Sequence, residues 1–354
     1  MKHNWKYKHW NDVLKIFNGK NQKAVENPNG MYPIYGSGGI LSYADDYICP
    51  ENCTIIGRKG NINNPIFVPN KFWNVDTAFG LSPYEQLHPR FLFYFCQIYD
   101  FERHNKATTI PSLVKNDLLK IKMPVPPMEK QEQIVAELDQ INDLIAKNRE
   151  LLSQLDALAQ SLFYDTFGDP IVNPKGWPIK KLSSVSKLIN GRAYKQNELL
   201  DNGKYRVIRV GNFFTNSDYY YSNLELPAEK YIDDGDLIFA WSASFGAFIW
   251  RAEKVIYHYH IWKILFDEKT LNKIFYKFLL NEMTSSFMKD LHGIGMMHLT
   301  KAGMEQYSLP IPPLALQEDF AAKVEANEAQ KAKVEAEIAE LQTLLDARMD
   351  YWFN

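Results

Sequence analysis

Residues 124–138, PVPPMEKQEQIVAEL, decide how this chain is organised, because they return 186 positions later as residues 310–324, PIPPLALQEDFAAKV. Upstream, residues 5–20 (WKYKHWNDVLKIFNGK) resemble residues 177–192 (WPIKKLSSVSKLINGR) at an offset of 172. The chain is therefore one unit written twice, and each copy is a globular block, a proline turn and a long helical segment. A duplicated unit tends to build a pseudo-two-fold object.

Both helical segments carry apolar residues at heptad spacing. The first has three such rows, which are Ile134, Ile141, Leu155 and Leu162, then Leu144, Leu151 and Leu158, then Leu138, Ile145 and Leu152. The second has a thinner stripe made of Phe320, Val324, Val334, Ile338, Leu341, Leu344 and Leu345. A rod of about 35 residues, roughly 50 Å long, cannot bury its stripe alone. We expect the two helices to pair antiparallel as an intramolecular coiled coil.

Three polar residues interrupt the expected seam, namely Asn148, Asn327 and Lys331. Buried polar groups at such positions often fix the register and orientation of paired helices. A solvated kink where the helices splay apart is the alternative interpretation.

The two blocks between the helices read as mixed α/β domains. In the first, residues 32–47 and 53–68 alternate strand-forming residues with Gly, Asn and Asp turns, and an aromatic helix is expected over 89–101. In the second, strands are expected over 204–213, 236–250 and 255–266, and a helix over 271–291. The expected division is 1–123 and 168–309 for the globular domains, with 124–167 and 310–354 for the spacer helices.

Charge is segregated along the chain, although the total is only −2. Counted on the sequence, residues 1–123 carry +5 and residues 168–309 carry +3, whereas each helical segment carries −5. A polyanion would be attracted to the globular blocks and repelled by the helices. Acidic residues on helices are also common because they increase solubility. Charge alone therefore allows two interpretations, binding of nucleic acid by the basic blocks or ordinary solubility of the acidic helices.

Composition narrows the class of protein further. The longest apolar runs are too short for a membrane span, the first residues lack the apolar stretch of a signal peptide, and three cysteines form no paired framework. We therefore expect a cytoplasmic protein with free thiols. Cys49 and Cys53 could be half a zinc site, but no second CxxC or HxxxH pair accompanies them.

Enzyme signatures are weak. Asn64-Pro65-Ile66-Phe67 lacks the second proline of the adenine-methyltransferase motif, and no GxxxxGK[ST] phosphate loop occurs. Residues 36–39 (GSGG) could cradle a phosphate or form a hairpin turn. His258 and His260 share one strand face, but a third metal ligand is not evident. We expect no catalytic residue and no metal site in this chain.

The duplicated PxPPxxxQ segment followed by a heptad helix resembles the specificity subunit of type I restriction-modification systems. The likeness extends over essentially the whole chain. It includes the tryptophan that opens each block, the Asn-Gly-Lys/Arg that follows, and the segments TTIPSLVKNDLLKIKMPVPP and GMMHLTKAGMEQYSLPIPP before the prolines. The order and spacing of these motifs are specific, whereas PPxxxQ alone would not be.

The resemblance implies a non-catalytic DNA-recognition subunit. In that family each target recognition domain reads one half of a bipartite DNA site, while the paired helices set the spacer and dock two modification (methyltransferase) subunits. S-adenosylmethionine, ATP and Mg are then expected on the modification and restriction subunits, with no cofactor in this chain. Half-sites near one helical turn apart, about 34–36 Å, would suit two basic domains on a stiff spacer.

We expect DNA contacts from Arg, Lys and polar side chains on loops. In the first block the candidates are Lys20, Arg58, Lys59, Asn61, Asn63, Asn64, Asn105, Lys106, Thr108 and Thr109. In the second block they are Arg192, Tyr194, Lys195, Arg209, Asn212, Ser242, Ser244, His292 and His298. Each could equally be part of a solvated turn. Two further hypotheses stay open, namely a self-sufficient DNA methyltransferase or nuclease, and a coiled-coil adaptor without DNA contact.

Overall fold

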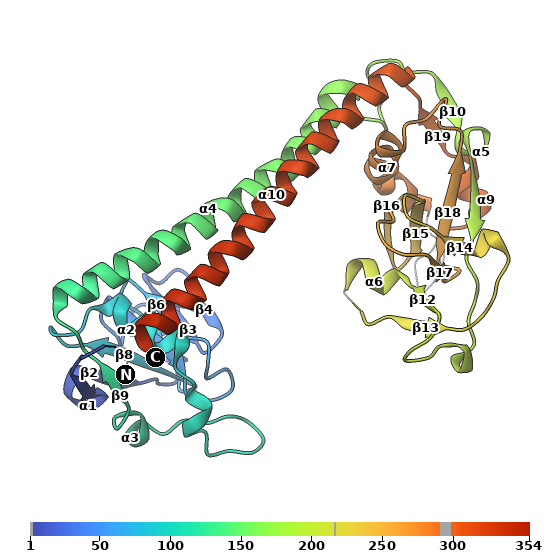
Figure 1. Cartoon of the computed structure of the whole chain (residues 1–354). Coiled ribbons are helices and arrows are strands. Elements are labelled where there is room, and N and C mark those ends of the chain that lie inside the picture. The colour runs from blue at the N-terminus through green and yellow to red at the C-terminus, as the bar shows by residue number, and fades with distance from the viewer. Residues whose placement is uncertain (1–2, 216, 291–298) are drawn as a thin grey trace. The chain divides into compact units, whose positions relative to one another are not determined.

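The computed structural model describes residues 3–215, 217–290 and 299–354, and the chain divides into two compact units (Figure 1). Unit 1 comprises Met1–Glu150 and Val334–Asn354, and unit 2 comprises Leu151–Lys333. Each unit contains one α/β domain and a segment of each of two long helices. The expected fold class, α/β domains combined with two long antiparallel helices, is confirmed.

The two long helices are α4, Met128–Phe167, and α10, Leu314–Phe353, of 40 residues each. Each begins directly after the proline pair of its repeat, because proline fixes an extended turn and disfavours helix in the residue before it. Neither helix contains a glycine or a proline, and Ala, Leu, Glu and Gln, all good helix formers, dominate both.

The repeated glutamine ties the start of each long helix to its own domain. Gln131 is fully buried and accepts from the His88 backbone N–H at 2.8 Å, while its amide donates to the carbonyls of Gln86 and Pro126 at 3.0 and 2.9 Å. Gln317 makes the same three bonds, accepting from Asn272 N–H at 2.8 Å and donating to Thr270 and Pro312. The PPxxxQ motif is therefore a structural clamp.

Within unit 1, the first part of α4 packs antiparallel against the end of α10. Glu137 pairs with Arg348 and accepts from the Trp352 indole at 3.0 Å, whereas Asn148, further along α4, donates to Glu337 at 3.3 Å. Ile134, Leu138, Ile141 and Ile145 are buried in one cluster with Leu345, Met349 and Phe353.

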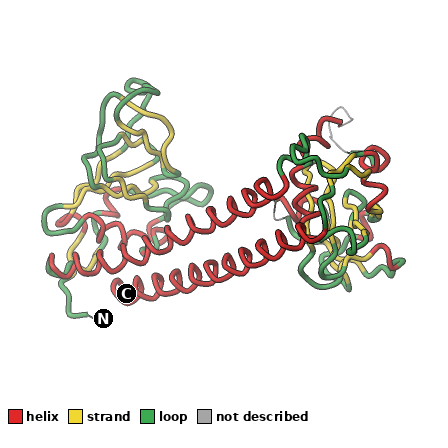
Figure 2. Tube along the Cα trace, turned by 90° about the horizontal axis from the view of Figure 1, so that it is seen from above, coloured by secondary structure: helices red, strands yellow, loops and turns green. Residues whose placement is uncertain are grey.

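Within unit 2, the end of α4 packs antiparallel against the first part of α10. The Asn327 amide donates to the Leu155 carbonyl at 2.8 Å, and Phe163 and Phe167 lie 5.8 and 5.3 Å from the Phe320 ring. In Figure 2 the two helices run side by side in each unit. The row Leu144, Leu151 and Leu158 takes no part in these seams. These side chains are 49%, 40% and 46% exposed.

Leu344, which the sequence placed in the stripe of the second helix, is 46% exposed and likewise lies outside the seam. Two straight helices can bury only one stripe of each, and the first and third rows occupy that stripe. The polar interruptions, by contrast, make contacts across the seam. Asn148 and Asn327 bond to the facing helix, and Lys331 pairs with Asp156 at 2.6 Å. These bonds favour a role in register over a splayed kink.

The first α/β domain, which is unit 1 without α4 and α10, has three small sheets in the orders β2-β8-β5-β6, β4-β3-β7 and β1-β9. Its strands are β1 Tyr7–His9, β2 Leu14–Asn18, β3 Tyr32–Gly36, β4 Gly39–Ala44, β5 Cys53–Gly57, β6 Ile66–Val68, β7 Trp73–Asn74, β8 Ala78–Pro83 and β9 Lys122–Pro124. Its helices are α1 Trp10–Val13, α2 Pro89–Ile98, η1 Phe101–His104 and α3 Lys115–Leu118.

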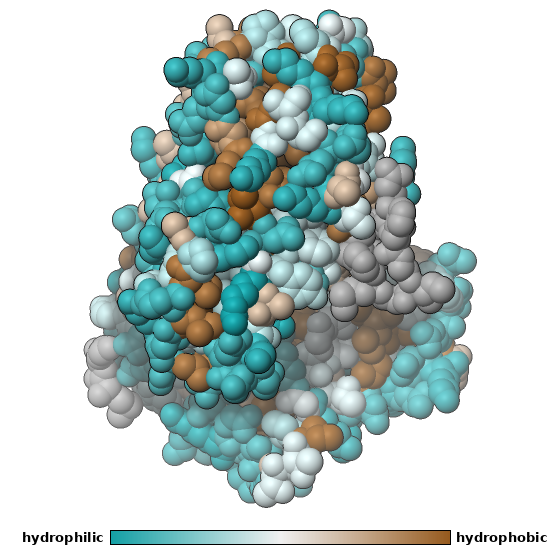
Figure 3. All heavy atoms as spheres, turned by 90° about the vertical axis from the view of Figure 1, so that its right-hand side faces the viewer, coloured by the Kyte–Doolittle hydropathy of each residue, from teal (hydrophilic) through white to brown (hydrophobic). Residues whose placement is uncertain are grey.

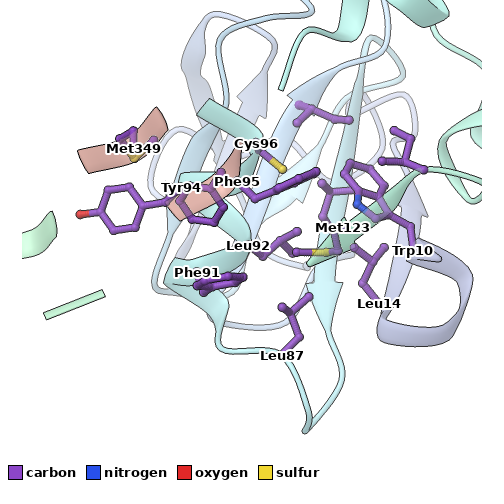
Figure 4. Close-up of a cluster of buried hydrophobic side chains, with 14 of the residues drawn as sticks. Trp10, Leu14, Leu87, Phe91, Leu92, Tyr94, Phe95, Cys96, Met123 and Met349 are labelled. Atoms are coloured by element: carbon purple, nitrogen blue, oxygen red, sulfur yellow. The ribbon is translucent and has the colours of Figure 1, made fainter. Parts of the chain in front are cut away.

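The core of this domain is an aromatic and aliphatic cluster beneath α2 (Figure 4). Trp10 and Phe91 are fully buried, and Phe95 is 4% exposed. Phe353, from the end of α10, lies 4.9 Å from the Phe91 ring and joins the same cluster. The helix end and the domain in unit 1 therefore share one core.

The second α/β domain, which is unit 2 without α4 and α10, has sheets in the orders β11-β18-β15-β16, β13-β12-β17-β14 and β10-β19. Its strands are β10 Ile179–Lys181, β11 Ser186–Asn190, β12 Tyr205–Ile208, β13 Tyr220–Ser222, β14 Tyr231–Ile232, β15 Leu237–Ser242, β16 Ser244–Ile249, β17 Val255–Tyr257, β18 Ile261–Phe266 and β19 Ser308–Pro310. Its helices are α5 Leu182–Val185, η2 Gln196–Glu198, α6 Val210–Phe214, η3 Ala228–Lys230, α7 Lys273–Glu282, α8 Thr284–Phe287, η4 Met288–Asp290 and α9 Lys301–Gln306.

Four expected elements differ from the structure. The strand expected over 236–250 is the hairpin of β15 and β16, which turns at Ala243. The strand expected over 255–266 is β17 and β18 with a turn between them, so His258 and His260 do not share a strand face.

Residues 204–213 are not one strand, because β12 ends at Ile208 and α6 follows, where the Asn212 side chain accepts from Arg209 N–H at 2.7 Å and closes a turn. The helix expected over 271–291 is α7, α8 and η4 in succession among the described residues. In both cases a polar side chain bonding to the nearby backbone, here Asn212 and Thr284, accompanies the break.

The two domains are built alike. Strands β3 and β7 run parallel, as do β12 and β17, and the order β2-β8-β5-β6 matches β11-β18-β15-β16. In each domain a turn of three residues connects the second of these parallel strands to a strand of the larger sheet. Residues 75–77 connect β7 to β8, and residues 258–260 connect β17 to β18.

Candidate nucleic-acid interface

The repeated Asn-Gly-Lys/Arg lies against these three-residue turns. Lys20 N–H donates to Asn74 O at 3.0 Å, and Arg192 N–H donates to Tyr257 O at 3.0 Å. A Cβ added at Gly19 would lie 1.8 Å from Val75 O, and one at Gly191 would lie 2.3 Å from His258 O. Only glycine allows two backbones to approach so closely.

In the first domain the turn of residues 75–77 connects several candidate loops. Arg58 N–H donates to Thr77 O at 2.8 Å, and its guanidinium donates to Asp76 O at 3.3 Å. Lys59 pairs with Ser112 in an isolated bridge, and Gly60 N–H donates to Pro111 O at 3.0 Å. The structure therefore brings Lys20, the loop 58–61 and the loop 105–113 together around one turn.

The candidates of this domain fall into two groups. Two of the asparagines organise the loops. Asn63 accepts from Phe101 N–H at 2.8 Å, and Asn105 accepts from the N–H groups of Ala107 and Ser112 at 3.0 Å each. Lys106 pairs with Asp117, and this bond lowers the pKa of the Asp117 carboxyl. Of the remaining candidates, Lys20, Lys59, Asn61, Asn64, Thr108 and Thr109 are exposed and Arg58 is half-buried.

In the second domain the turn of residues 258–260 is again the meeting point. His258 N–H donates to Ile208 O at 2.9 Å, beside Arg209, and Tyr259 N–H donates to Arg192 O at 3.1 Å. The Trp241 indole donates to Tyr259 O at 3.0 Å. Arg192, Arg209 and the strand leading to Ser242 thus converge on one turn.

The guanidinium of Arg192 is paired with the carboxylate of Glu198. Its guanidinium donates two bonds to Glu198, at 2.9 and 2.7 Å, and stacks 5.2 Å from the Tyr194 ring. The hydrogen bonds from Arg192 lower the pKa of Glu198 to about 2. The pair is ionised near neutral pH, so Arg192 holds the loop 192–198, in which Lys195 is exposed.

Arg209 and Asn212 lie on the turn that forms α6. Arg209 is exposed and stacks 5.1 Å from the Tyr220 ring, whereas Asn212 also donates to Ser217 O at 2.7 Å. Ser242 is buried and Ser244 half-buried on either side of Ala243, whose φ of 63° marks the tight β15–β16 turn. His292 and His298 lie outside the described residues.

The imidazole of His258 is neutral at physiological pH. Burial, aided by the neighbouring charges of His260 and Arg209, lowers the pKa of His258 to about 4. A neutral imidazole can donate or accept a hydrogen bond but adds no positive charge for a phosphate.

In Figure 3 hydrophilic side chains cover most of the visible face, with small separate hydrophobic groups between them.

Sequence reasoning missed the two turns themselves. No sequence motif falls on Val75-Asp76-Thr77, and His258 and His260 stand out in the sequence only as possible metal ligands. The available signal was the glycine of each Asn-Gly-Lys/Arg, which requires another backbone segment close by. Which segment that is depends on sheet topology and cannot be read from local sequence.

Side chains of the metal-ligating types and thiols can be located in the described part of the chain. There, no group of three or more His, Cys, Asp or Glu side chains could hold a metal ion. Cys49, Cys53 and Cys96 are buried, and burial raises the pKa of each thiol, to about 11 for Cys53. Among the described helices, none is both long enough and apolar enough to cross a membrane.

Two curated relatives are specificity subunits of type I restriction enzymes. The MjaVIII specificity subunit from Methanocaldococcus jannaschii is 22% identical over 392 residues, and the match covers 96% of this chain and 92% of that protein. That of EcoBI from Escherichia coli is 28% identical over 172 residues, so the match spans 48% of this chain and only 36% of the EcoBI subunit.

Solved structures share the fold. The type I restriction-modification S subunit from M. genitalium has a TM-score of 0.60 at 14% identity, covering 99% of this chain and 96% of that one. A second solved structure, described as the basis of complex assembly and conformational transition in the type I restriction-modification system, has a TM-score of 0.62 at 16% identity. The match covers 98% of this chain and 96% of that one.

The family model described as the type I restriction modification DNA specificity domain matches residues 2–157 and 174–343. It matches twice, once over each repeat, and together the matches cover most of the chain. The resemblance first drawn from the repeated PxPPxxxQ segment is confirmed. The chain belongs to the DNA specificity family of type I restriction-modification systems, whose role is DNA sequence recognition.

Proposed function

We propose that this chain is the non-catalytic sequence-reading subunit of a type I complex, with residues 1–123 and 168–309 each reading one half of a bipartite DNA site. The observation that supports this most is the loop cluster built twice, around residues 75–77 and 258–260, on segments of net charge +5 and +3. Positive loops bind phosphate without regard to sequence, and polar side chains among them can reach base edges.

The candidate residues then divide by role. Cationic side chains of the loop clusters would contact phosphates, whereas their other polar side chains would contact bases or phosphates. The first set is Lys20, Arg58, Lys59, Lys195 and Arg209, and the second is Asn61, Asn64, Thr108, Thr109, Tyr194, Ser242 and Ser244. Asn63, Asn105, Lys106, Arg192 and Asn212 would act by holding the loops, because each is engaged by a nearby protein group. His292 and His298 remain candidates.

The spacer helices, residues 124–167 and 310–354, would set the distance between half-sites and dock two modification subunits. The exposed leucine row of α4, Leu144, Leu151 and Leu158, supports docking, because three large apolar side chains at heptad spacing are a helix face suited to a partner. The net charge of −5 on each segment would keep the helices away from DNA phosphates.

In this assembly S-adenosylmethionine would be bound by the modification subunits, and ATP with Mg by restriction subunits where these are present. The chain itself would need no cofactor, and it would act in the cytoplasm, where DNA is present. Double-stranded DNA is the ligand of the two domains.

The function is tested by co-expressing the chain with its modification subunit in a methylation-free host and sequencing the methylated bases. We expect one asymmetric, bipartite motif with a fixed spacer. Methylation without a bipartite motif would reject the proposal. Methylation by the purified chain alone, given S-adenosylmethionine, would support the self-sufficient enzyme instead.

Docking through the leucine row predicts the effect of Leu151→Glu combined with Leu158→Glu. Both side chains are exposed, so we expect the melting temperature of the chain to change by less than about 2 °C. Affinity for the modification subunit, measured by calorimetry, should fall by about tenfold or more, because two charges would be buried without partners. Leu344→Glu, at an exposed leucine on α10, is the matched control. Equal losses for both variants, or no loss, would contradict docking on this row.

A further inference from the structure

We infer that the turns Val75-Asp76-Thr77 and His258-Tyr259-His260 are the specificity-determining elements of the two domains, with Asp76 and Tyr259 contacting base edges. This inference rests on the proposed function, since it names the residues with which each domain would discriminate bases. It adds a position in each half of the chain that the sequence motifs do not mark.

The two turns are equivalent, although their sequences differ completely. Each has three residues, and each is fixed by the same backbone bonds. Val75 N–H donates to Tyr35 O at 2.9 Å, as His258 N–H donates to Ile208 O at 2.9 Å. The strand after each turn is also bonded alike, since Gly19 N–H donates to Ala78 O at 3.3 Å and Gly191 N–H to Ile261 O at 3.2 Å. A fixed frame with variable side chains suits an element that sets specificity.

In each turn the middle side chain is the most exposed. Asp76 is exposed between buried Val75 and half-buried Thr77. Tyr259 is 38% exposed, whereas His258 and His260 on either side are less so. The frame therefore presents one side chain from each domain at the centre of its loop cluster.

The charge of Asp76 decides what it can contact. It lies in the loop cluster with Lys20, Arg58 and Lys59, which would draw a phosphate backbone toward this surface. A carboxylate there repels phosphate, but it accepts hydrogen bonds from exocyclic amino groups, above all cytosine N4 in the major groove. Asp76 is thus suited to a base edge that carries an amino donor.

Tyr259 offers a phenol hydroxyl on a ring that is already held in place. Its ring centroid lies 3.9 Å from that of His260, 4.4 Å from that of His258 and 6.1 Å from that of Trp241. Because these contacts fix the ring before DNA arrives, little conformational entropy would be lost on binding. The hydroxyl can donate and accept, and the ring edge can pack against a base.

The test uses Asp76→Asn and Tyr259→Ala in the full complex with the modification subunit, on a DNA library randomised across both half-sites. Asp76→Asn keeps the shape of the side chain but exchanges one acceptor for a donor. We expect the preference of this variant complex for one base over the others to relax or switch by about tenfold or more at one base pair of one half-site. The preferences at the other half-site should be unchanged. Tyr259→Ala should relax one position in the opposite half-site only.

Controls separate specificity from folding and from the function itself. Asp12→Asn, at an exposed carboxylate on α1, should leave both half-sites intact. Tyr259→Phe keeps the ring and tests the hydroxyl alone, should the alanine variant fail to fold. A uniform loss of methylation at all sites with unchanged preferences would overturn the inference, because the turns would then be structural. If the unmodified complex shows no bipartite preference, the proposed function fails, which is a distinguishable result.

Discussion

Gly19→Ala is expected to destabilise the first α/β domain by about 3 kcal/mol or more, because the new methyl group would collide with backbone that has no room to move. The added Cβ would lie 1.8 Å from Val75 O and 2.7 Å from Asn74 O. Both carbonyls belong to the turn frame, which is anchored by Tyr35 and Ala78. Denaturant unfolding of the full chain, with hydrogen exchange of β2, β7 and β8, measures the effect.

The chain provides controls for this prediction. Gly38→Ala, at the β3–β4 turn of the same domain, has nothing within 4 Å of the added Cβ and should be tolerated. Gly191→Ala should repeat the damage in the second domain, where the Cβ would lie 2.3 Å from His258 O, and should leave α2 protected from exchange. Wild-type stability of Gly19→Ala would show that the two backbones are not held as close as described.

The architecture of the chain could be predicted from its sequence because duplication is visible without structural knowledge. The proline pair and the glutamine recur at fixed positions, and heptad spacing predicts the long helices. A chain that folds back on itself would pair these helices antiparallel. The sequence could not say which apolar row is buried. Leu144, Leu151 and Leu158 satisfy the same periodicity as the buried rows, and only the packing in each unit separates them.

The candidate interface could be predicted only in part. Composition points to polar loops, and several of the candidate residues do lie on loops that meet. Asn105 and Arg192, however, are chemically indistinguishable in sequence from DNA-contacting residues, although the structure engages them with Ser112 and Glu198. The turns at 75–77 and 258–260 were missed because strands distant in sequence position them.

Gln131→Leu is expected to lower the free energy of unfolding of unit 1 by about 3–5 kcal/mol. Leucine has a similar volume but would leave the His88 N–H and the carbonyls of Gln86 and Pro126 without their buried partner. Each unsatisfied buried group costs about 1–3 kcal/mol. The expected loss is measured by urea unfolding, and the start of α4 should lose hydrogen-exchange protection first.

Two further variants serve as controls for this prediction. Gln140→Leu changes an exposed glutamine on the same helix and should alter stability by less than about 0.5 kcal/mol. Gln317→Leu should cost as much as Gln131→Leu, but in unit 2, because Gln317 makes the same three bonds there. If Gln131→Leu were as mild as Gln140→Leu, the motif would not be a clamp.

Gln131→Glu should show a loss of stability that depends on pH, which distinguishes the clamp from simple packing. The substitution replaces the amide donor that serves Gln86 O and Pro126 O with a carboxyl oxygen. When ionised, the new carboxylate faces two carbonyl oxygens, so its pKa in the folded chain must rise above its unfolded value of about 4.3. The folded state then holds more protons than the unfolded state between these two pKa values, so stability falls as pH rises through that range. Relative to the unmodified chain, the variant should therefore be less damaged near pH 4.5 than at pH 7.5, and a loss independent of pH would show that the amide donor is not what holds the helix start.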